Sequence, residues 1–346
     1  MTSKFSQALD FENGVVEMAH GSGGRAMAQL IEELFFHLLD NPLLRERNDQ
    51  ACFKVSEGRM VMSTDGHVIS PLFFPGGDIG CLSVHGTVND VAMAGAKPLY
   101  LSAAFILEAG FPLKDLRKIV ASMGDAATQA GVPIVTGDTK VVERGKGDGV
   151  FITTTGIGVV PPNVNISGNN AKPGDAILVS GTMGDHGVAI MSQRAGLKFG
   201  TSIVSDTAAL HTLVAEIVKA VPQVRVLRDP TRGGLATTLN EICEQSNVGM
   251  KLFEANIPVR PQVQAACELL GLDPLYVANE GKLIAICAPE HANQLLEVMK
   301  THHLGQNATI IGHVLQDKRN FVQMETAFGG QRIVQWLSGE QLPRIC

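Results

Sequence analysis

The chain is poor in aromatic residues, has no excess of positive charge and carries no paired cysteines. Its 346 residues include 14 Phe, 2 Tyr and 1 Trp, and 28 basic side chains stand against 34 acidic ones, a formal net charge of −6. Nucleic-acid-binding proteins usually combine a basic surface with aromatic side chains that stack on bases, so nucleic acid is not expected as a partner. The six cysteines form no C-x-x-C pair, which argues against a zinc knuckle or a disulfide framework.

Long hydrophobic runs are also missing. Residues 1–20 contain no basic stretch followed by an apolar run, and no segment approaches the roughly 18 consecutive apolar residues that a bilayer requires. The sequence therefore predicts a soluble, cytoplasmic protein without membrane contact.

Glycine, in contrast, is abundant, and the apolar residues follow both helical and strand periods. The 37 glycines indicate many tight turns. Apolar residues over 27–39 are spaced as on one face of a helix, and apolar residues over 99–107 alternate with others as on a half-buried strand. We expect strands near 59–64, 99–107, 135, 150–160, 176–180, 224–228, 282–288 and 308–315, and helices near 27–40, 79–96, 113–127, 207–219, 234–245 and 290–300, with another starting at 185.

Turn-forming residues are densest between Pro161 and Gly174, and a domain boundary is expected there. Because strands and helices alternate on both sides of it, we expect two domains of the α/β (α+β) class. The expected divisions are a segment with a glycine-rich loop and helix (1–44), an N-terminal domain (45–162), a C-terminal domain (163–336) and a flexible tail (337–346).

Gly21, Gly23 and Gly24 precede a predicted helix, where backbone N–H groups could surround phosphate oxygens. A simple glycine turn that begins a helix is the commoner explanation. The chain has neither a complete G-x-G-x-x-G nor a G-x-x-x-x-G-K-[ST] motif that would favour phosphate binding by itself.

Three aspartates occupy positions that suit a divalent cation. Asp65 ends a predicted strand, Asp90 lies in a very apolar predicted helix, and Asp138 follows another strand. Mg²⁺ prefers one or two carboxylates together with substrate phosphates, and Lys140, two residues after Asp138, favours a polyphosphate site. A helix cap, a turn aspartate or a buried ion pair would explain each aspartate singly.

Two later segments add candidates. Asp229 stands in a turn with two arginines and two glycines that could bind phosphate or cap a helix, and Glu280 precedes a strand as a base or a surface acid. The histidines show no zinc-site spacing, and most are expected to be structural or exposed. Cys346 is the last residue, and a chain end can enter a pocket as a substrate does.

The chain resembles the HypE family of hydrogenase maturation proteins, within a superfamily that includes aminoimidazole ribonucleotide synthetase and selenophosphate synthetase. The resemblance covers almost the whole chain, and the terminal Pro-Arg-Ile-Cys makes it specific. The matching segments are 20–24, 63–65, 89–95, 136–141, 179–187, 229–234, 278–282 and 343–346.

The resemblance implies an N-terminal sheet that pairs with that of a second subunit to form a barrel across a homodimer. ATP and Mg²⁺ would lie between the domains and near the dimer interface. It implies metal contacts on Asp65, Asp90, Asp138 and Asp229. It also implies residues that hold the nucleotide, with Asp138 in both sets: Gly21, Gly23, Gly24, Asn89, Asp138, Thr139 and Lys140.

The implied reaction makes the cyanide ligand of nickel–iron hydrogenase. A carbamoyltransferase, HypF, would load a carboxamide onto Cys346, and this chain would use ATP to dehydrate it to a thiocyanate for a HypC–HypD scaffold. Lys140 would assist phosphoryl transfer, Glu280 is the first candidate for the base and His20 the second. A synthetase acting on a free small molecule and a nucleotide-gated scaffold are the competing hypotheses.

Overall fold

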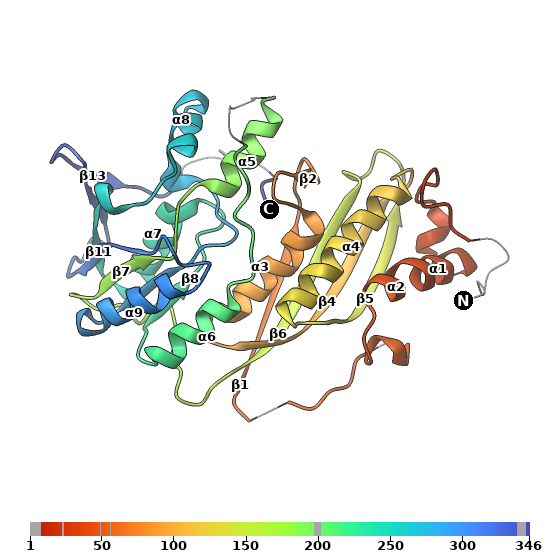
Figure 1. Ribbon diagram of the computed structural model, residues 1–346, viewed down its shortest axis with the longest axis horizontal. Coiled ribbons are helices and arrows are strands. Elements are labelled where there is room, and N and C mark those ends of the chain that lie inside the picture. The colour runs from red at the N-terminus through yellow and green to blue at the C-terminus, as the bar shows by residue number, and fades with distance from the viewer. Residues whose placement is uncertain (1–7, 23, 49, 56, 197–201, 338–343) are drawn as a thin grey trace.

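The computed structural model describes residues 8–22, 24–48, 50–55, 57–196, 202–337 and 344–346. These residues form two lobes that lie side by side along the longest axis of the molecule (Figure 1). Both lobes mix strands and helices, which confirms the predicted α/β class. None of the helices within the described ranges is long and apolar enough to cross a membrane.

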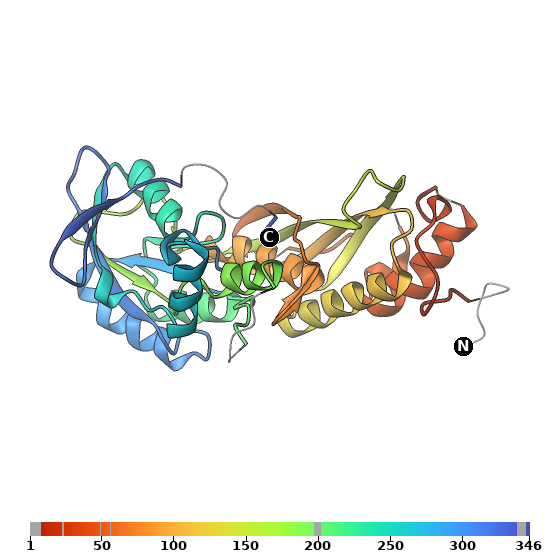
Figure 2. The ribbon, with the colours of Figure 1, turned by 90° about the horizontal axis from the view of Figure 1, so that it is seen from above.

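The first lobe is built on a four-stranded sheet. Its order is β1 (Arg59–His67), β6 (Val150–Val160), β4 (Lys97–Glu108) and β5 (Ile134–Val142), with β4 and β5 parallel and the other pairs antiparallel. Alternate residues of β4, including Leu101 and Phe105, are buried in one cluster with residues of α3 (Ile79–Met93) and α4 (Leu113–Ala130). Figure 2 shows both helices on one side of the sheet, and the alternation predicted for β4 is confirmed.

The N-terminal segment packs against the far edge of this sheet. A short 3-10 turn, η1 (Met18–Gly21), is followed by a continuous helical stretch made of α1 (Arg25–Leu30), the π-helical turn η2 (Ile31–Phe35) and α2 (Phe36–Leu38). This stretch agrees with the helix predicted near 27–40. A further 3-10 turn, η3 (Leu44–Glu46), follows it.

The second lobe has a seven-stranded sheet with helices on both faces. Ile177 and Val179 of the interior strand β7 (Ala176–Val179) pack toward α7 (Gly234–Ser246), whereas Ala176 and Leu178 pack toward α6 (His211–Ala220) and α9 (Pro289–Thr301). This strand is therefore apolar at every position. The strand order is β13 (Gln331–Val334), β12 (Val322–Glu325), β9 (Gly249–Phe253), β11 (Thr309–Leu315), β7 (Ala176–Val179), β10 (Ile284–Cys287) and β8 (Val226–Arg228). The helices are α5 (Asp185–Arg194), α6 (His211–Ala220), α7 (Gly234–Ser246), α8 (Pro261–Leu270) and α9 (Pro289–Thr301).

Several elements differ from the sequence prediction. The strands β9, β12 and β13, the helix α8 and the short pair β2 (Phe73–Phe74) and β3 (Gly77–Asp78) were not expected. The helix predicted at 207–219 begins instead at His211. The preceding loop is held by partners outside the helix, since the backbone N–H of Leu210 donates a 2.7 Å hydrogen bond to Asn89 Oδ1.

Candidate functional site

Four acidic side chains approach one another where the two lobes meet. Asp65 on β1 and Asp90 on α3 come from the first lobe, whereas Asp229 after β8 and Glu280 before β10 come from the second. We call these four residues the carboxylate cluster. Their charges interact, because Asp65, Asp90 and Asp229 all act on Glu280.

The turn after Asp229 is shaped by glycine. Gly233 and Gly234 have φ values of 74° and 61°, a region that side chains disfavour, and a Cβ on Gly234 would lie 2.6 Å from the carbonyl oxygens of Leu275 and Val277. This close approach starts α7 directly beside the loop that precedes β10. It therefore brings the turn that holds Asp229 near the segment that holds Glu280.

Burial and mutual repulsion make the carboxylate cluster hard to ionise. Burial raises the pKa of Asp229 to about 7, with the charge of Asp90 adding to the shift. Burial also raises the pKa of Asp90, although the Ser63 hydroxyl donates a 2.7 Å hydrogen bond to its Oδ2. The pKa of Glu280 lies well above its usual range for the same reasons, and its buried Oε1 has no hydrogen-bond partner among the described residues.

The chemistry of these oxygens suits Mg²⁺, which would relieve their repulsion. The side chains alone do not form a complete metal site, since within the described ranges no three acidic, histidine or cysteine side chains are placed to hold one ion. Phosphate oxygens would have to supply further ligands.

The last three residues of the chain lie beside this cluster. Ile345 forms an antiparallel bridge with Ile69, and the backbone N–H groups of Val68 and Ser70 donate to the carbonyl oxygens of Cys346 (2.9 Å) and Arg344 (3.2 Å). The Ile345 side chain is buried in the core of the first lobe. The tail residues 338–343 that lead to this point lie outside the described residues, and so does the predicted Gly23.

The sulfur of Cys346 is half-buried and close to the carboxylate cluster. Burial raises the pKa of its thiol, and the charges of Glu280, Asp65 and Asp229 raise it further, whereas Arg232 lowers it. The thiol is therefore neutral in this position and is a poor nucleophile.

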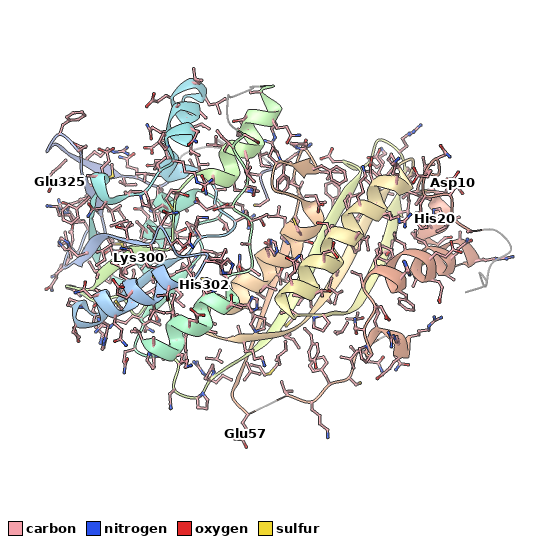
Figure 3. The ribbon with its side chains drawn as sticks, viewed as in Figure 1. Asp10, His20, Glu57, Lys300, His302 and Glu325 are labelled. Atoms are coloured by element: carbon pink, nitrogen blue, oxygen red, sulfur yellow. The ribbon has the colours of Figure 1, made fainter. Side chains whose placement is uncertain are left out.

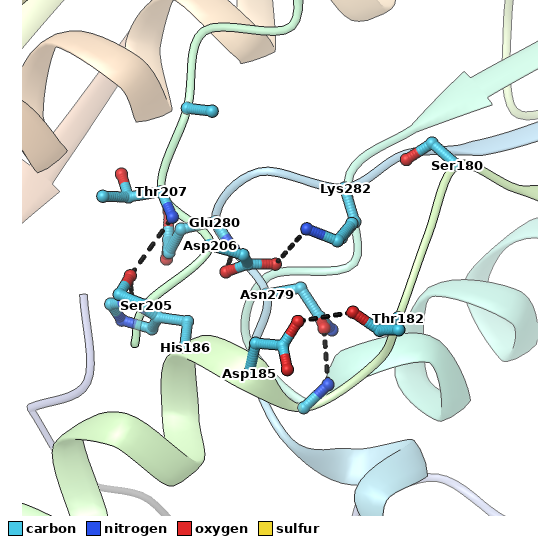
Figure 4. Close-up of polar contacts among 12 residues, drawn as sticks. Ser180, Thr182, Asp185, His186, Ser205, Asp206, Thr207, Asn279, Glu280 and Lys282 are labelled. Carbon is cyan, nitrogen blue, oxygen red and sulfur yellow. Dashed lines mark hydrogen bonds and ion pairs between the residues drawn. The ribbon is translucent and has the colours of Figure 1, made fainter. Parts of the chain in front are cut away.

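A polar network joins this region to the loop before α6 (Figure 4). The backbone N–H of Glu280 donates to Asp206 Oδ1 at 3.0 Å, and Lys282 Nζ lies 3.2 Å from Asp206 Oδ2. Because Asp206 fixes both residues flanking Gly281, the Glu280 backbone is held firmly.

Asn89 belongs to the same network rather than to an open phosphate site. Its Nδ2 donates to the carbonyl oxygens of Ala208 (3.0 Å) and Glu280 (3.2 Å), and its Oδ1 accepts from the N–H of Leu210. Both amide hydrogens are thus engaged, and the predicted role of Asn89 in holding phosphates stays a prediction. In this conformation Asn89 ties α3 to the second lobe.

The remaining predicted residues gather at β5, on the opposite edge of the first sheet. We call His20, Gly21, Gly24, Asp138, Thr139 and Lys140 the β5 group. Lys140 Nζ donates to both carboxylate oxygens of Asp138 at 2.8 and 2.6 Å, and the Thr139 N–H donates to Asp138 Oδ1. A cavity of about 870 Å³ that includes Asp138, Arg25 and Arg47 opens beside this group.

His20 is buried in the β5 group, and Figure 3 shows it at the end of the molecule that carries α1 and α2. Its Nδ1 accepts a 2.9 Å hydrogen bond from the N–H of Glu17, and burial lowers its pKa. Gly21 packs so closely on β5 that a Cβ would lie 2.5 Å from the Val141 nitrogen.

The two groups are separate within one chain. Asp65 pairs with Thr154, Thr154 with Ala103, and Ala103 with Gly137, the neighbour of Asp138. Three strand spacings of roughly 4.8 Å put Asp65 and Asp138 about 14 Å apart. Asp138 therefore does not join the other three predicted metal ligands within a single chain, and its predicted metal contact, implied near a dimer interface, stays a prediction.

The sequence analysis assigned no site role to the side chains that hold the tail and Glu280, which are His186, Arg194, Ser205, Asp206, Lys282 and Ile345. His186, Lys282 and Ile345 fall within the segments that carry the family resemblance, and His186 lies beside a glycine-rich turn at a helix start. Nothing in the local sequence marks Ser205 or Asp206, which act through contacts distant in the chain.

The two lobes correspond to a known class of protein. Residues 47–160 match the family described as AIR synthase related protein, N-terminal domain, and residues 172–325 match the corresponding C-terminal domain. Both lobes are thus those of an AIR synthase-related protein.

Individual relatives identify a more specific family within this class. The chain is 69% identical to carbamoyl dehydratase HypE of Cupriavidus necator over 343 residues, which cover 99% of this chain and 98% of that protein. A crystal structure of hydrogenase maturation protein HypE in complex with ATP has a TM-score of 0.92 at 53% identity, covering 95% of this chain and 99% of the other. A HypE–HypF complex structure matches with a TM-score of 0.79 at 50% identity, over 89% and 99%. The chain belongs to the HypE family, a family of carbamoyl dehydratase enzymes.

Proposed function

We propose that this chain uses ATP to dehydrate an S-carboxamide on its own Cys346 to a thiocyanate, the precursor of the cyanide ligand of nickel–iron hydrogenase. The observation that carries the proposal is the position of the terminal sulfur, beside Glu280 and the acidic residues of both lobes. The names of the relatives, carbamoyl dehydratase and HypE in complex with ATP, support the same reaction.

The chemical difficulty is that the amide oxygen is a poor leaving group. In the proposed reaction this oxygen attacks the γ-phosphorus of ATP, the bond to the β-phosphate oxygen breaks, and ADP leaves while the nitrogen loses one proton. The C–O bond of the resulting phosphorylated intermediate then breaks, phosphate leaves with the bonding electrons, and loss of the second N–H proton completes the C≡N bond. The sum is carboxamide and ATP in, and thiocyanate, ADP, phosphate and a proton out.

Glu280 would accept a proton from the amide nitrogen. Its raised pKa makes the ionised carboxylate a stronger base, and bases with a pKa near the working pH are the most effective. His20 is the second candidate, but it lies in the β5 group of the same chain, away from Cys346. It could act only across an assembly of two copies.

Mg²⁺ would be held by Asp65, Asp90 and Asp229, whose oxygens have the right chemistry. When bound, it would neutralise charge on the phosphates. The protein side of this arrangement is the set of acidic residues from both lobes. The pKa values of Asp90 and Asp229 stay raised by burial although Arg228 lowers both.

A homodimer would bring the two groups together. The face of the first sheet opposite α3 and α4 exposes apolar side chains, including Met60, Met62 and Ile106. If two such sheets close a barrel by pairing their edges, β1 of one copy lies near β5 of the other. Asp138, Thr139, Lys140 and the loop of Gly21 and Gly24 in the second copy would then lie beside the strand that carries Asp65 and contact the nucleotide phosphates.

The proposed partners follow from the same chemistry. HypF, with which a relative forms a complex of known structure, would load the carboxamide, and a HypC–HypD scaffold would receive the cyano group. The thiol docked beside the carboxylate cluster is neutral, so loading would take place with the tail withdrawn. We expect these steps in the cytoplasm.

The direct test is mass spectrometry of the C-terminal peptide after incubation with the carbamoyltransferase, carbamoyl phosphate and ATP. We expect the peptide to gain one carboxamide and then to lose one water only when ATP is present. Cys346→Ala should fold, bind ATP and remain unmodified. A carboxamide that persists with ATP, or modification of Cys346→Ala at another thiol, would reject the proposal.

Deleting residues 344–346 separates the competing hypotheses. A synthetase for a free small molecule would keep its activity, and a scaffold would lose only partner binding. The proposed dehydratase would lose its substrate while still binding ATP.

A further inference from the structure

The backbone oxygens of the last three residues accept hydrogen bonds from both lobes. Ser70 donates to Arg344 and Val68 donates to Cys346, both from the first lobe. The carbonyl between them, that of Ile345, points the opposite way, as expected in an antiparallel bridge. The Ile345 carbonyl oxygen contacts His186 of α5, whose Nε2 lies 2.7 Å away.

The proton positions on His186 follow from its partners. A carbonyl oxygen can only accept, so Nε2 carries the hydrogen and Nδ1 must accept. Nδ1 lies 2.7 Å from Ser205 Oγ, which in turn accepts a 3.1 Å hydrogen bond from the N–H of Thr207. The serine hydroxyl therefore donates to Nδ1 and fixes the tautomer that can donate to the tail.

His186 is completely buried and is held edge-on against the ring of Phe74, 5.5 Å away between centroids. Burial lowers its pKa, so the ring is neutral. Asp206, adjacent to Ser205, accepts from the backbone of Glu280. The same loop thus positions the side chain that contacts the tail and the residue proposed as the base.

We propose that His186, oriented by Ser205, is the positioning residue that sets the depth of the terminal cysteine relative to Glu280. This inference rests on the proposed function, because it assigns a task to His186 only if Cys346 carries the reacting group. A neutral donor suits a tail that must enter and leave repeatedly, since it adds no charge beside the thiol and makes one hydrogen bond that can be exchanged for water.

The test compares His186→Asn with His186→Gln in the full-length protein. Asparagine keeps an amide near the position of Nδ1 but is too short to reach the tail, whereas glutamine can place a donor near the position of Nε2. Loss of one hydrogen bond should increase the docked tail's opening by about tenfold. We expect His186→Asn to raise the alkylation rate of Cys346 by iodoacetamide, and hydrogen exchange at Val68 and Ser70, by about that factor, with His186→Gln closer to wild type.

Two further variants keep the test decisive. Ser205→Ala retains His186 but removes its orienting hydroxyl, and a smaller increase in both rates is expected. His302→Asn is the matched control, because His302 is another buried histidine bonded to a hydroxyl, that of Thr212, and Figure 3 shows it beside α6 and α9. Thermal unfolding measures any general loss of stability in each variant.

In carboxamide-loaded protein, His186→Asn should also slow the ATP-dependent loss of water by about tenfold without changing ATP affinity. Unchanged tail rates in His186→Asn, or an equal increase in His302→Asn, would overturn the inference. The alkylation and exchange rates are measured on protein without a carboxamide, so they test the role of His186 independently of the dehydration reaction. If carboxamide-loaded wild-type protein never lost water, that result would reject the proposed function and not the role of His186.

Discussion

Glu280 shows how environment changes the chemistry of a common residue. A glutamate on the surface would be ionised and a weak base, but this side chain is buried near four other acids, and its Oε1 has no hydrogen-bond partner among the described residues. Its backbone, held by Asp206 and Asn89, cannot withdraw to relieve the repulsion. Such a destabilised carboxylate is suited to accept a proton from a substrate held beside it.

We expect Glu280→Gln to fold normally, because the amide matches the neutral carboxyl in shape. The variant should slow the ATP-dependent loss of water from the loaded tail by about 10²- to 10⁴-fold, the usual contribution of a general base. Single-turnover mass spectrometry would measure the rate, with Glu290→Gln on the exposed start of α9 as the control. A rate near wild type would move the role of base away from Glu280, with His20 next to be tested.

At the scale of elements, the glycine-rich loop is fixed by how closely it approaches β5. A Cβ at Gly21 would clash with the Val141 backbone, whereas a Cβ at Gly24 would enter open space. The two glycines therefore have different reasons to lack a side chain. Gly21 is required by packing within the chain, whereas packing among the described residues does not require a glycine at position 24.

We predict that Gly21→Ala lowers the free energy of unfolding by about 1–3 kcal/mol, since η1 must shift away from β5. Gly24→Ala should change it by less than about 0.5 kcal/mol. Urea unfolding would measure both, and calorimetry with ATP would show whether Gly24→Ala weakens nucleotide binding, as a loop that cradles phosphates requires. Equal stability of the two variants would contradict the packing argument.

At the scale of the whole molecule, the carboxylate cluster and the β5 group are on opposite edges of one sheet, and the tail spans the two lobes. Val68 contacts the tail from the first lobe and His186 from the second. One chain thus brings the sulfur of Cys346 close to Glu280 and to three of the predicted aspartates, while Asp138 lies about 14 Å from Asp65. A second copy is the simplest means of completing the site.

Met62→Lys should therefore convert a dimer to a monomer. The Met62 side chain is 71% exposed at the open face of the sheet, and a lysine there would place a charge inside the proposed barrel. Leu269→Lys is the matched control, because Leu269 is 72% exposed but lies on α8 of the other lobe. Analytical ultracentrifugation would measure the masses. A dimeric Met62→Lys would place the interface elsewhere.

The sequence by itself determined the α/β class, the burial pattern of β4 and the family, because each depends on local periodicity or on motifs contiguous in the chain. Only the tertiary structure decided that Asp138 is separated from Asp65, that both hydrogens of the Asn89 amide are engaged, and that His186 contacts Ile345 across 159 positions of sequence. Contacts of this kind depend on how the two lobes pack and on which strands form the sheet edges. Neither leaves a regular pattern in the residues that make the contact.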